Sequence, residues 1–397
     1  MPGKVLILLV SLLCVTMAGC VVNASPETEK KEPVLTAADA DQTFEQGSKA
    51  SMNNISVVSL HGTWGEMGRQ YGKLMKDELH EVHDFVENMI ASSSENTERS
   101  KSIIALDQAQ YTNSMREFME GASETSGLTM DQIQAVNALE RIGGLPKCSA
   151  VFCWDEYSSG PLVAGRNYDY SNAFAPLKDD MVITVYHPAD GSLAVAAIGY
   201  AGEINTYNAI NEKGIFMELN NGTPSTNIKT QTDRIQGTTM LFAAMFETDE
   251  LNDWELFFNT VACSGSYIIN VADSQSARSY EWCPTGVKTG NTDLPDGLLV
   301  STNYYVNPDW LFATPSDANS WEGLTRRRNL ITLSENSKGR IDAGRMQEII
   351  ETPVEKGGAM NELTMYQIVV VPETKMLWLQ VVGGPEWTQI DLSVFLD

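Results

Sequence analysis

Histidine is scarce in this chain of 397 residues, which contains only four. His187 stands before a proline at the expected end of a strand, and no nucleophile motif surrounds it. His80 and His83 are one helical turn apart, but no third metal ligand is near, and we expect both to be solvated. The chain has no Gly-x-Ser-x-Gly elbow, phosphate-binding loop or dinucleotide fingerprint. A hydrolase with this sequence therefore needs a base other than histidine, and we expect neither a metal nor a cofactor.

Basic residues are also few, with 27 Lys and Arg against 52 Asp and Glu, for a net charge of −25. Nucleic-acid binding depends on positive side chains that displace counterions from phosphates, and no basic stretch supplies them here. We therefore expect no nucleic-acid partner. The negative net charge also disfavours an anionic membrane surface as the main partner. The sequence leaves the oligomeric state open.

Apolar runs of the roughly 18 residues that a membrane-spanning helix needs are absent. Val5 to Val15 is a shorter run, with Lys4 before it and Met17-Ala18-Gly19-Cys20 after it, a pattern typical of a bacterial lipobox. We expect residues 1–19 to be a signal peptide and Cys20 to be lipidated, so that an exported protein is anchored to the membrane through its lipid. An ordinary secretory signal is the alternative. Residues 20–55, with few large apolar side chains, are expected to form a flexible stalk.

Cysteine is rare as well, and two of the six cysteines, Cys14 and Cys20, belong to the export signal. None of the other four has the close paired spacing of a zinc site. Outside the cytoplasm they could form disulfides, and Cys263 and Cys283 could pair across neighbouring strands. Cys153 is expected to be a buried apolar residue, too far along an extended strand to bond Cys148.

The spacing of apolar residues changes near residue 147. Before it, residues 64–141 carry apolar side chains at helical spacing, and Thr129 begins a capping box before the last helical run. After it come short apolar runs bounded by Gly, Pro, Asp and Ser, which predict strands. Hairpins are expected over 207–220 and 365–382, and helices over 238–259, 324–335 and 343–351. Strands in runs with helices between them indicate an α+β layered domain.

The most informative stretch runs from Cys148 to Asp169. A cysteine opens a predicted strand, a turn follows at Ser158 to Pro161, and a second strand contains Arg166 and Asp169. This hairpin would return both charged residues to the cysteine. An arginine there would stabilise a thiolate, and an aspartate would hold a nearby ammonium group. If Cys148 were the first residue of a chain, its α-amine, with an ordinary pKa of about 7.7–8.0, would serve as the base.

These residues resemble the N-terminal nucleophile (Ntn) hydrolases of the choloylglycine hydrolase, acid ceramidase and isopenicillin-N acyltransferase group. The matching motifs are Cys148-Ser-Ala, Gly165-Arg-Asn-x-Asp169, the segments His61 to Gly72 and Gln132 to Glu140, the hairpin Asn211 to Asn220, Val300-Ser-Thr-Asn303 and Leu324-Thr-Arg326. Each motif is weak alone, but their order along residues 60–397 is that of the family.

The resemblance implies a role for each matching residue. Cys148 is the nucleophile and its freed α-amine the base, flanked by Arg166 and Asp169. Asn220, by its backbone N–H or its side chain, and Asn303, by its side chain, would bind the oxyanion, and Arg326 would brace the cluster. Arg327, its neighbour, is left open as the alternative to Arg326.

The resemblance also implies the architecture and the activity. We expect a four-layer αββα Ntn-hydrolase sandwich, with a helical pro-segment over 56–147 and a catalytic domain over 148–397. The expected activity is hydrolysis of a small acyl-amide, a linear amide, through a thioester after autocatalytic cleavage before Cys148. Acyl transfer to an amine, and a lipid-anchored binding protein of the same fold that never matures, are the alternatives.

Overall fold

The computed structural model describes residues 33–144, 147–204, 207–226, 228–312, 315–318, 320–384 and 386–397. The expected signal peptide, Cys20 and the beginning of the expected stalk lie outside these residues. None of the helices in the described ranges is long and apolar enough to cross a membrane. The description below concerns the unit formed by Pro33–Asp397.

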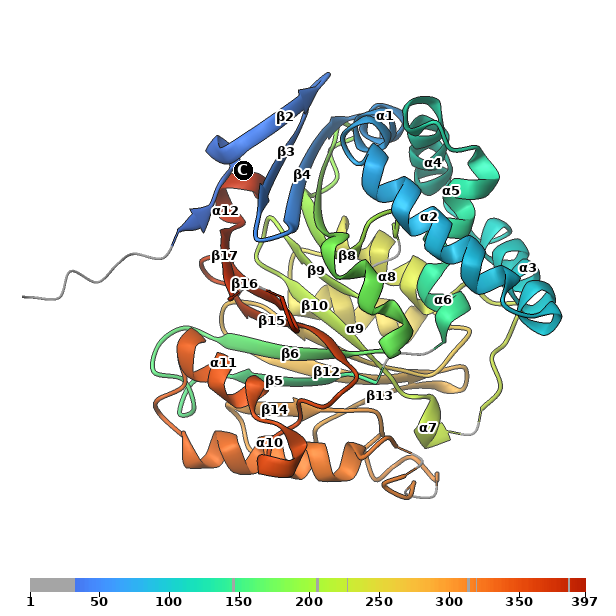
Figure 1. Cartoon of the computed structure of the whole chain (residues 1–397). Coiled ribbons are helices and arrows are strands. Elements are labelled where there is room, and N and C mark those ends of the chain that lie inside the picture. The colour runs from blue at the N-terminus through green and yellow to red at the C-terminus, as the bar shows by residue number, and fades with distance from the viewer. Residues whose placement is uncertain are drawn as a thin grey trace, which may run out of the picture. The chain divides into compact units, whose positions relative to one another are not determined.

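The strands of the described residues form two sheets (Figure 1). The first has the order β1 (Val34–Leu35), β17 (Thr388–Asp391), β16 (Met376–Val381), β15 (Thr364–Val371), β6 (Val163–Asp169), β5 (Ser149–Cys153) and β14 (Leu298–Ser301). The second has the order β13 (Gly286–Thr289), β12 (Ala277–Cys283), β11 (Tyr267–Ala272), β10 (Phe216–Asn221), β9 (Asn208–Asn211), β8 (Val195–Tyr200), β7 (Met181–Pro188), β4 (Ile55–Gly62), β3 (Gly47–Met52) and β2 (Ala40–Phe44). Most neighbouring strands are antiparallel, whereas β1 pairs with β17, and β4 with β7, in parallel.

The two sheets pack face to face. Tyr366 of the first sheet contacts Tyr200 of the second, and its hydroxyl accepts a hydrogen bond from Asn208 Nδ2 at 2.9 Å. Farther along, the rings of Phe152 and Phe216 lie 6.1 Å apart across the same interface. Aromatic pairs of this kind contribute about 0.5–1.5 kcal/mol beyond the area that they bury.

Helices cover the outer faces of both sheets. The first sheet carries α10 (Gly323–Asn336) and α11 (Ala343–Glu351), which lie beside β5, β6 and β14 in Figure 1. The second carries α1 (Trp64–Leu74), α8 (Gly237–Met245) and α9 (Leu251–Thr260), which contact its strands. The predicted four-layer αββα sandwich is confirmed.

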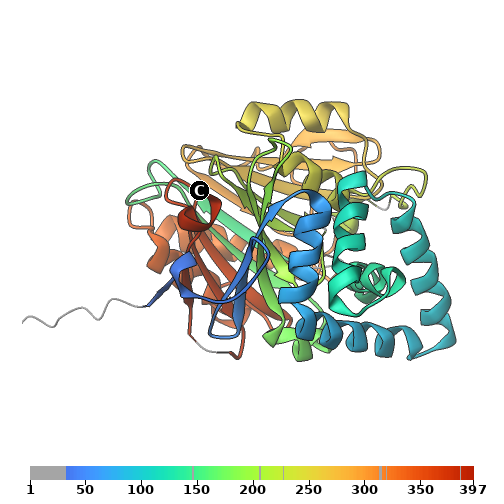
Figure 2. The same cartoon turned by 90° about the horizontal axis from the view of Figure 1, so that it is seen from above.

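The remaining helices gather next to α1, as Figure 2 shows from above. They are α2 (Lys76–Ala91), α3 (Ser94–Gln108), α4 (Asn113–Ser126), α5 (Met130–Asn137) and α6 (Leu139–Gly143), while the short α7 (Thr223–Thr226) and α12 (Ser393–Leu396) lie elsewhere. The helical character predicted for 64–141 is confirmed, including the capping box in which Thr129 accepts from the backbone of Gln132.

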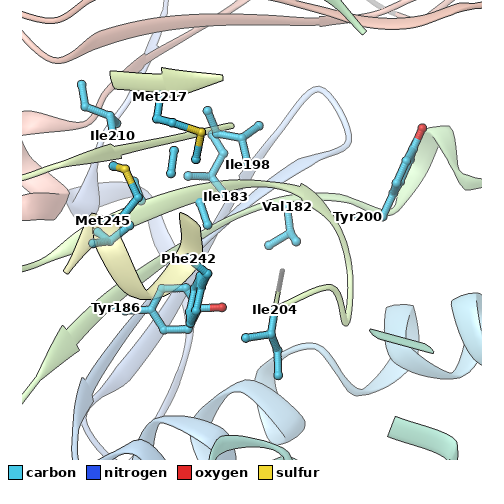
Figure 3. Close-up of a cluster of buried hydrophobic side chains, with 14 of the residues drawn as sticks. Val182, Ile183, Tyr186, Ile198, Tyr200, Ile204, Ile210, Met217, Phe242 and Met245 are labelled. Carbon is cyan, nitrogen blue, oxygen red and sulfur yellow. The ribbon is translucent and has the colours of Figure 1, made fainter. Parts of the chain in front are cut away.

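Buried side chains of β7 to β10 and α8 pack on both faces of the second sheet (Figure 3). Toward the helices, the rings of Tyr186 of β7 and Phe242 of α8 lie 5.6 Å apart. Ile183, Ile198 and Ile210 share the opposite face with Phe216, which packs against the first sheet. Met217 of β10 and Met245 of α8 belong to the same core. All eight side chains are at most 2% exposed. Burying a side chain of this size contributes about 1.5–3 kcal/mol, so these side chains stabilise the packing on both faces of the second sheet.

The expected stalk over 20–55 differs from the structure from Val34 onward. Residues 34–52 form β1, β2 and β3, at the edges of both sheets. The prediction failed because these strands contain mostly small and polar residues, which a packed edge accepts. Ala50 is buried, and the ammonium group of Lys49 is paired with Glu78 of α2.

The expected pro-segment, 56–147, is not helical throughout. Its first residues belong to β4, which lies between β3 and β7 in the second sheet and pairs with β7 over eight positions. The segment is therefore a structural part of the sandwich, and cleavage after Lys147 would leave a strand of it hydrogen-bonded inside the sheet.

The predictions for the two hairpins are confirmed, whereas those for His83 and for a disulfide between Cys263 and Cys283 are not. The hairpins over 207–220 and 365–382 are present, and Gly214 takes a φ of +79° in the first turn, as a glycine can. His83 is buried rather than solvated, since it belongs to the inner face of α2. Cys263 and Cys283 are free buried thiols, and so is Cys153.

Close approach of α1 and α4 gives a first prediction. A Cβ on Gly68 would lie 2.0 Å from the Phe118 carbonyl oxygen, whereas a Cβ on Gly65 would meet only an ordinary contact at 3.8 Å. Gly68→Ala should therefore lower the free energy of unfolding by about 1–3 kcal/mol, despite the better helix propensity of alanine. Denaturant unfolding beside the matched variant Gly65→Ala measures this, and equal stability of the two variants would contradict the packing described.

Candidate active site

Cys148 lies directly before β5, and the hairpin expected around it is present. Strand β5 pairs with β6, with Ala150 opposite Arg166 and Ser149 opposite Asn167. Arg166 Nη2 therefore donates to the Cys148 Sγ at 3.0 Å. The two side chains are at most 1% exposed, so this contact is made away from bulk water.

Strand β10 of the second sheet holds the other side of Arg166. Its Nη2 donates to the Leu219 carbonyl at 2.6 Å, and Nη1 forms an ion pair with the Glu218 carboxylate. Glu218 is fully buried. The sequence analysis missed this residue, although it lies within the motif Asn211 to Asn220 and two positions before Asn220 on the same strand.

Asp169 lies at the end of β6, where three side chains contact its carboxylate. Arg326 Nη1 pairs with it at 3.1 Å, and Asn361 Nδ2 and Thr364 Oγ1 donate to it at 2.9 and 2.7 Å. Burial raises the pKa of Asp169, and the hydrogen bonds and Arg326 oppose that shift. Asn361 and Thr364 were also missed, because they reach the site only through the pairing of β15 with β6.

Arg326, at the beginning of α10, contacts both sides of the Lys147–Cys148 peptide bond. Its Nη1 donates to the Lys147 carbonyl at 3.2 Å and to the Cys148 carbonyl at 3.1 Å, and Nη2 donates to Asn303 Oδ1 at 2.8 Å. Arg327 points elsewhere, to the Val300 carbonyl and Asp293. Of the two arginines left open by the sequence, the structure places Arg326 in the cluster.

Asn303 and Asn220 were both predicted to bind an oxyanion. Asn303 lies in the cluster, where Nδ2, which carries two hydrogens, donates one bond, to the Asn221 carbonyl at 3.0 Å. Asn220 Nδ2 donates to Ser301 at 2.8 Å and to Glu218 at 3.2 Å, so both hydrogens of that amide are engaged. The structure thus brings Asn303, rather than the Asn220 side chain, next to Arg326.

The Cys148 thiol is protonated at neutral pH in this uncut chain. Burial raises its pKa to about 11, although the nearby Arg166 acts in the opposite direction. The expected stabilisation of a thiolate by Arg166 is therefore outweighed by the loss of hydration. Because the Cys148 nitrogen is part of a peptide bond here, it cannot act as a base.

Glu140 of α6 brings a further carboxyl group close to the cluster. The Tyr168 hydroxyl donates to its carboxylate, and the Glu140 backbone N–H donates to Glu203 Oε1 at 3.3 Å. Both carboxyl groups are buried; burial raises the pKa of Glu140 to about 7, and burial and the neighbouring Glu140 raise the pKa of Glu203. A carboxyl group with the pKa of Glu140 carries a proton at low pH and loses it near neutrality.

A pocket of about 620 Å³ opens beside these residues, and Lys147, Arg326 and Asn361 are among its lining residues. It gives solvent a route to the end of the Lys147–Cys148 segment. Within the described part of the chain, no group of three or more His, Cys, Asp or Glu side chains is arranged to hold a metal ion. The chemistry that the cluster supports is nucleophilic attack by sulfur, with cationic and amide donors around it.

Comparison with protein-family models finds no match, and comparison with curated proteins finds none either. Solved structures do match. A Caenorhabditis elegans N-acylethanolamine-hydrolyzing acid amidase ortholog is 18% identical, with a TM-score of 0.43 over 57% of this chain and 93% of its own. A mutant conjugated bile acid hydrolase from Clostridium perfringens is 13% identical, with a TM-score of 0.42 over 62% and 92%. Penicillin V acylase from Agrobacterium tumefaciens is 9% identical, with a TM-score of 0.39 over 62% and 86%.

The raised pKa of Glu140 predicts a pH dependence of stability. The pKa is about 7 in the folded chain against an ordinary value of 4.5, so the contribution of this group is fully present below about pH 4.5 and is lost as the pH rises through about 7. Glu140→Gln cannot ionise, and its melting temperature should fall less between pH 5 and pH 8 than that of the wild type. The difference between the folded and ordinary pKa of Glu140 limits the effect on the free energy of unfolding to about 3 kcal/mol.

Thermal unfolding at the two pH values measures this effect. Glu87→Gln, on the exposed face of α2, is the control for a change of net charge and should follow the wild type. Equal falls for wild type and Glu140→Gln would contradict the assignment.

Proposed function

We propose that this protein hydrolyses linear amide bonds, with the Cys148 sulfur as nucleophile, after cleavage of its own Lys147–Cys148 bond. The observation that supports this most directly is the 3.0 Å contact between Arg166 Nη2 and Cys148 Sγ inside a buried cluster that also contains Asp169, Asn303 and Arg326. A buried cysteine with only a structural role needs neither an arginine at its sulfur nor one at its carbonyl.

The proposed maturation is an acyl shift followed by hydrolysis. The sulfur attacks the Lys147 carbonyl carbon, the Cys148 nitrogen takes up a proton and leaves, and Lys147 becomes the acyl part of a thioester. Water then adds to the thioester, which releases the Lys147 carboxyl group and the thiol. Arg326 donates to the Lys147 carbonyl of this peptide bond and to the Cys148 carbonyl that follows it, so it is positioned to polarise the carbonyl that the sulfur attacks.

The proposed reaction on a substrate repeats these steps with the new α-amine as base. The amine, with an ordinary pKa of about 7.7–8.0, accepts the thiol proton and later gives it to the leaving amine. Asn303 Nδ2 would donate its second hydrogen to the oxyanion, and Asp169 would stabilise the ammonium form of the amine. Water hydrolyses the thioester and completes the cycle.

The segment before Cys148 is proposed to stay attached after cleavage, because β4 is hydrogen-bonded on both sides within the second sheet. Export and lipidation at Cys20 are proposed from the N-terminal sequence, in which Met17-Ala18-Gly19 precedes that cysteine.

Mapping of the N-termini tests the maturation. Active protein should contain a chain that begins at Cys148, held together with the preceding segment under native conditions. Cys148→Ala should remain one chain and lose turnover of acyl amides by at least about 10³-fold. Cys153→Ala, which removes a buried thiol on the same strand, is the control and should be cut normally. A fully active preparation without an N-terminus at Cys148 would contradict the proposal.

Substitution of Asn303 tests the oxyanion role. Asn303→Ala should lower kcat by about 10²–10³ with a smaller change in KM, since the donor acts mainly in the transition state. Asn220→Ala should have a smaller effect, because both of its amide hydrogens are already engaged. Steady-state kinetics on correctly processed variants with native far-ultraviolet spectra give the comparison, and a larger loss for Asn220→Ala would reverse the assignment.

A further inference from the structure

The pocket beside the cluster has an acidic and aromatic lining that the proposed chemistry does not use. Trp321 and Glu322 lie in the turn before α10, and Glu355 and Glu362 come from the segment between α11 and β15. Trp321 and Glu322 take φ angles of +52° and +60°, which are disfavoured for residues with side chains. Arg326 Nε donates to the Trp321 carbonyl at 3.2 Å, so the active-site arginine itself fixes this turn.

A cation already occupies this pocket in the uncut chain. The Lys147 Nζ lies over the Trp321 ring, 5.3 Å from its centroid. An ammonium group at this distance is attracted by the quadrupole of the indole. The side chain of the residue at the scissile bond therefore shows where a positively charged group can bind.

The charge of the lining favours the same kind of group. Glu322, Glu355 and Glu362 are exposed, and within the described residues no basic side chain lies within 4.0 Å of their carboxylates. Arg326, the other cation of the pocket, is buried and paired with Asp169. Three carboxylates around one concave site raise the local concentration of cations.

The position of Lys147 in the reaction identifies the part of a substrate that would replace it. In the proposed cleavage, the Lys147 carbonyl carbon is the acyl carbon that the sulfur attacks, so its side chain belongs to the acyl half. After the cut, Lys147 is no longer bonded to Cys148, and a substrate must bring its own acyl carbon to the same sulfur. The side chain of that acyl group would then point to the pocket that Lys147 has left.

We propose that this pocket selects substrates whose acyl half carries a cationic side chain, as in amides of Nα-acylated lysine. This inference rests on the proposed amide hydrolysis and adds the substrate class. Arg326 and Asn361 belong both to the pocket and to the cluster around Asp169, so a bound acyl side chain lies next to the catalytic groups.

The kinetic test compares Nα-acetyl-lysine p-nitroanilide with Nα-acetyl-norleucine p-nitroanilide, which has a side chain of similar length without the charge. The processed protein should hydrolyse the lysine compound with a kcat/KM about tenfold higher or more, which is the scale of a cation–π contact supported by carboxylates. The preference should shrink toward one in Trp321→Leu and in the triple variant Glu322→Gln, Glu355→Gln and Glu362→Gln. It should also weaken with added salt.

A matched triple variant controls for net charge. Glu87→Gln, Glu95→Gln and Glu373→Gln remove the same three charges from exposed positions outside the pocket lining and should keep the preference. Equal rates for the two anilides, or a preference that survives in the pocket variants, would overturn the inference while leaving amide hydrolysis intact.

A binding test separates this inference from the proposed function. The full-length variant Lys147→Ala with Cys148→Ala is not cut and has no lysine in the pocket. It should bind Nα-acetyl-lysine N-methylamide about tenfold more tightly than the norleucine analogue, as measured by calorimetry. If no N-terminus forms at Cys148 and no amide is hydrolysed, the proposed function fails. Selective binding would then still support the pocket as a cation site, and equal affinity would overturn it.

Discussion

The contact between a buried guanidinium group and a buried sulfur is the interaction around which the site is built. Arg166 can reach Cys148 only because β5 and β6 form a hairpin. A guanidinium group taken out of water is costly unless its charge is compensated, and Glu218 supplies that compensation from the opposite sheet. The pair therefore ties the two sheets together next to Cys148.

A second buried ion pair, Arg326 with Asp169, completes the arrangement from the helix side. Both ion pairs are buried, where apolar side chains would stabilise the fold at lower cost. A loss of stability from buried charged groups is typical of functional sites, where groups are held in place before the reaction begins. Burial holds the proton on the Cys148 thiol, and the Cys148 nitrogen is part of a peptide bond, so under the proposed mechanism this site is inactive until the chain is cut.

The parts of the site that could be predicted from the sequence are those whose contacts join residues close together in the chain. The hairpin that joins Cys148 to Arg166 and Asp169 is local, and a strand–turn–strand pattern was enough to predict it. Glu218, Asn361 and Thr364 could not be predicted, since Thr364 meets Asp169 through a pairing of strands 195 residues apart. The choice of Arg326 over Arg327 could not be predicted either. Adjacent helical residues point in different directions around the helix axis, and only the tertiary packing shows which direction faces the cluster. Strands β1 to β3 were missed because small and polar residues carry no alternating pattern.

The covalent acyl-enzyme gives the most direct test of the central claim. The processed protein is mixed with hexanoyl p-nitroanilide or, if the acidic pocket requires a charge, with Nα-acetyl-lysine p-nitroanilide, and is quenched in acid within milliseconds. Mass spectrometry of the digested protein should find the added acyl mass on a peptide whose first residue is Cys148. An acyl mass on Cys153 or on any other residue, or hydrolysis by protein in which Lys147 and Cys148 are still joined, would contradict this account.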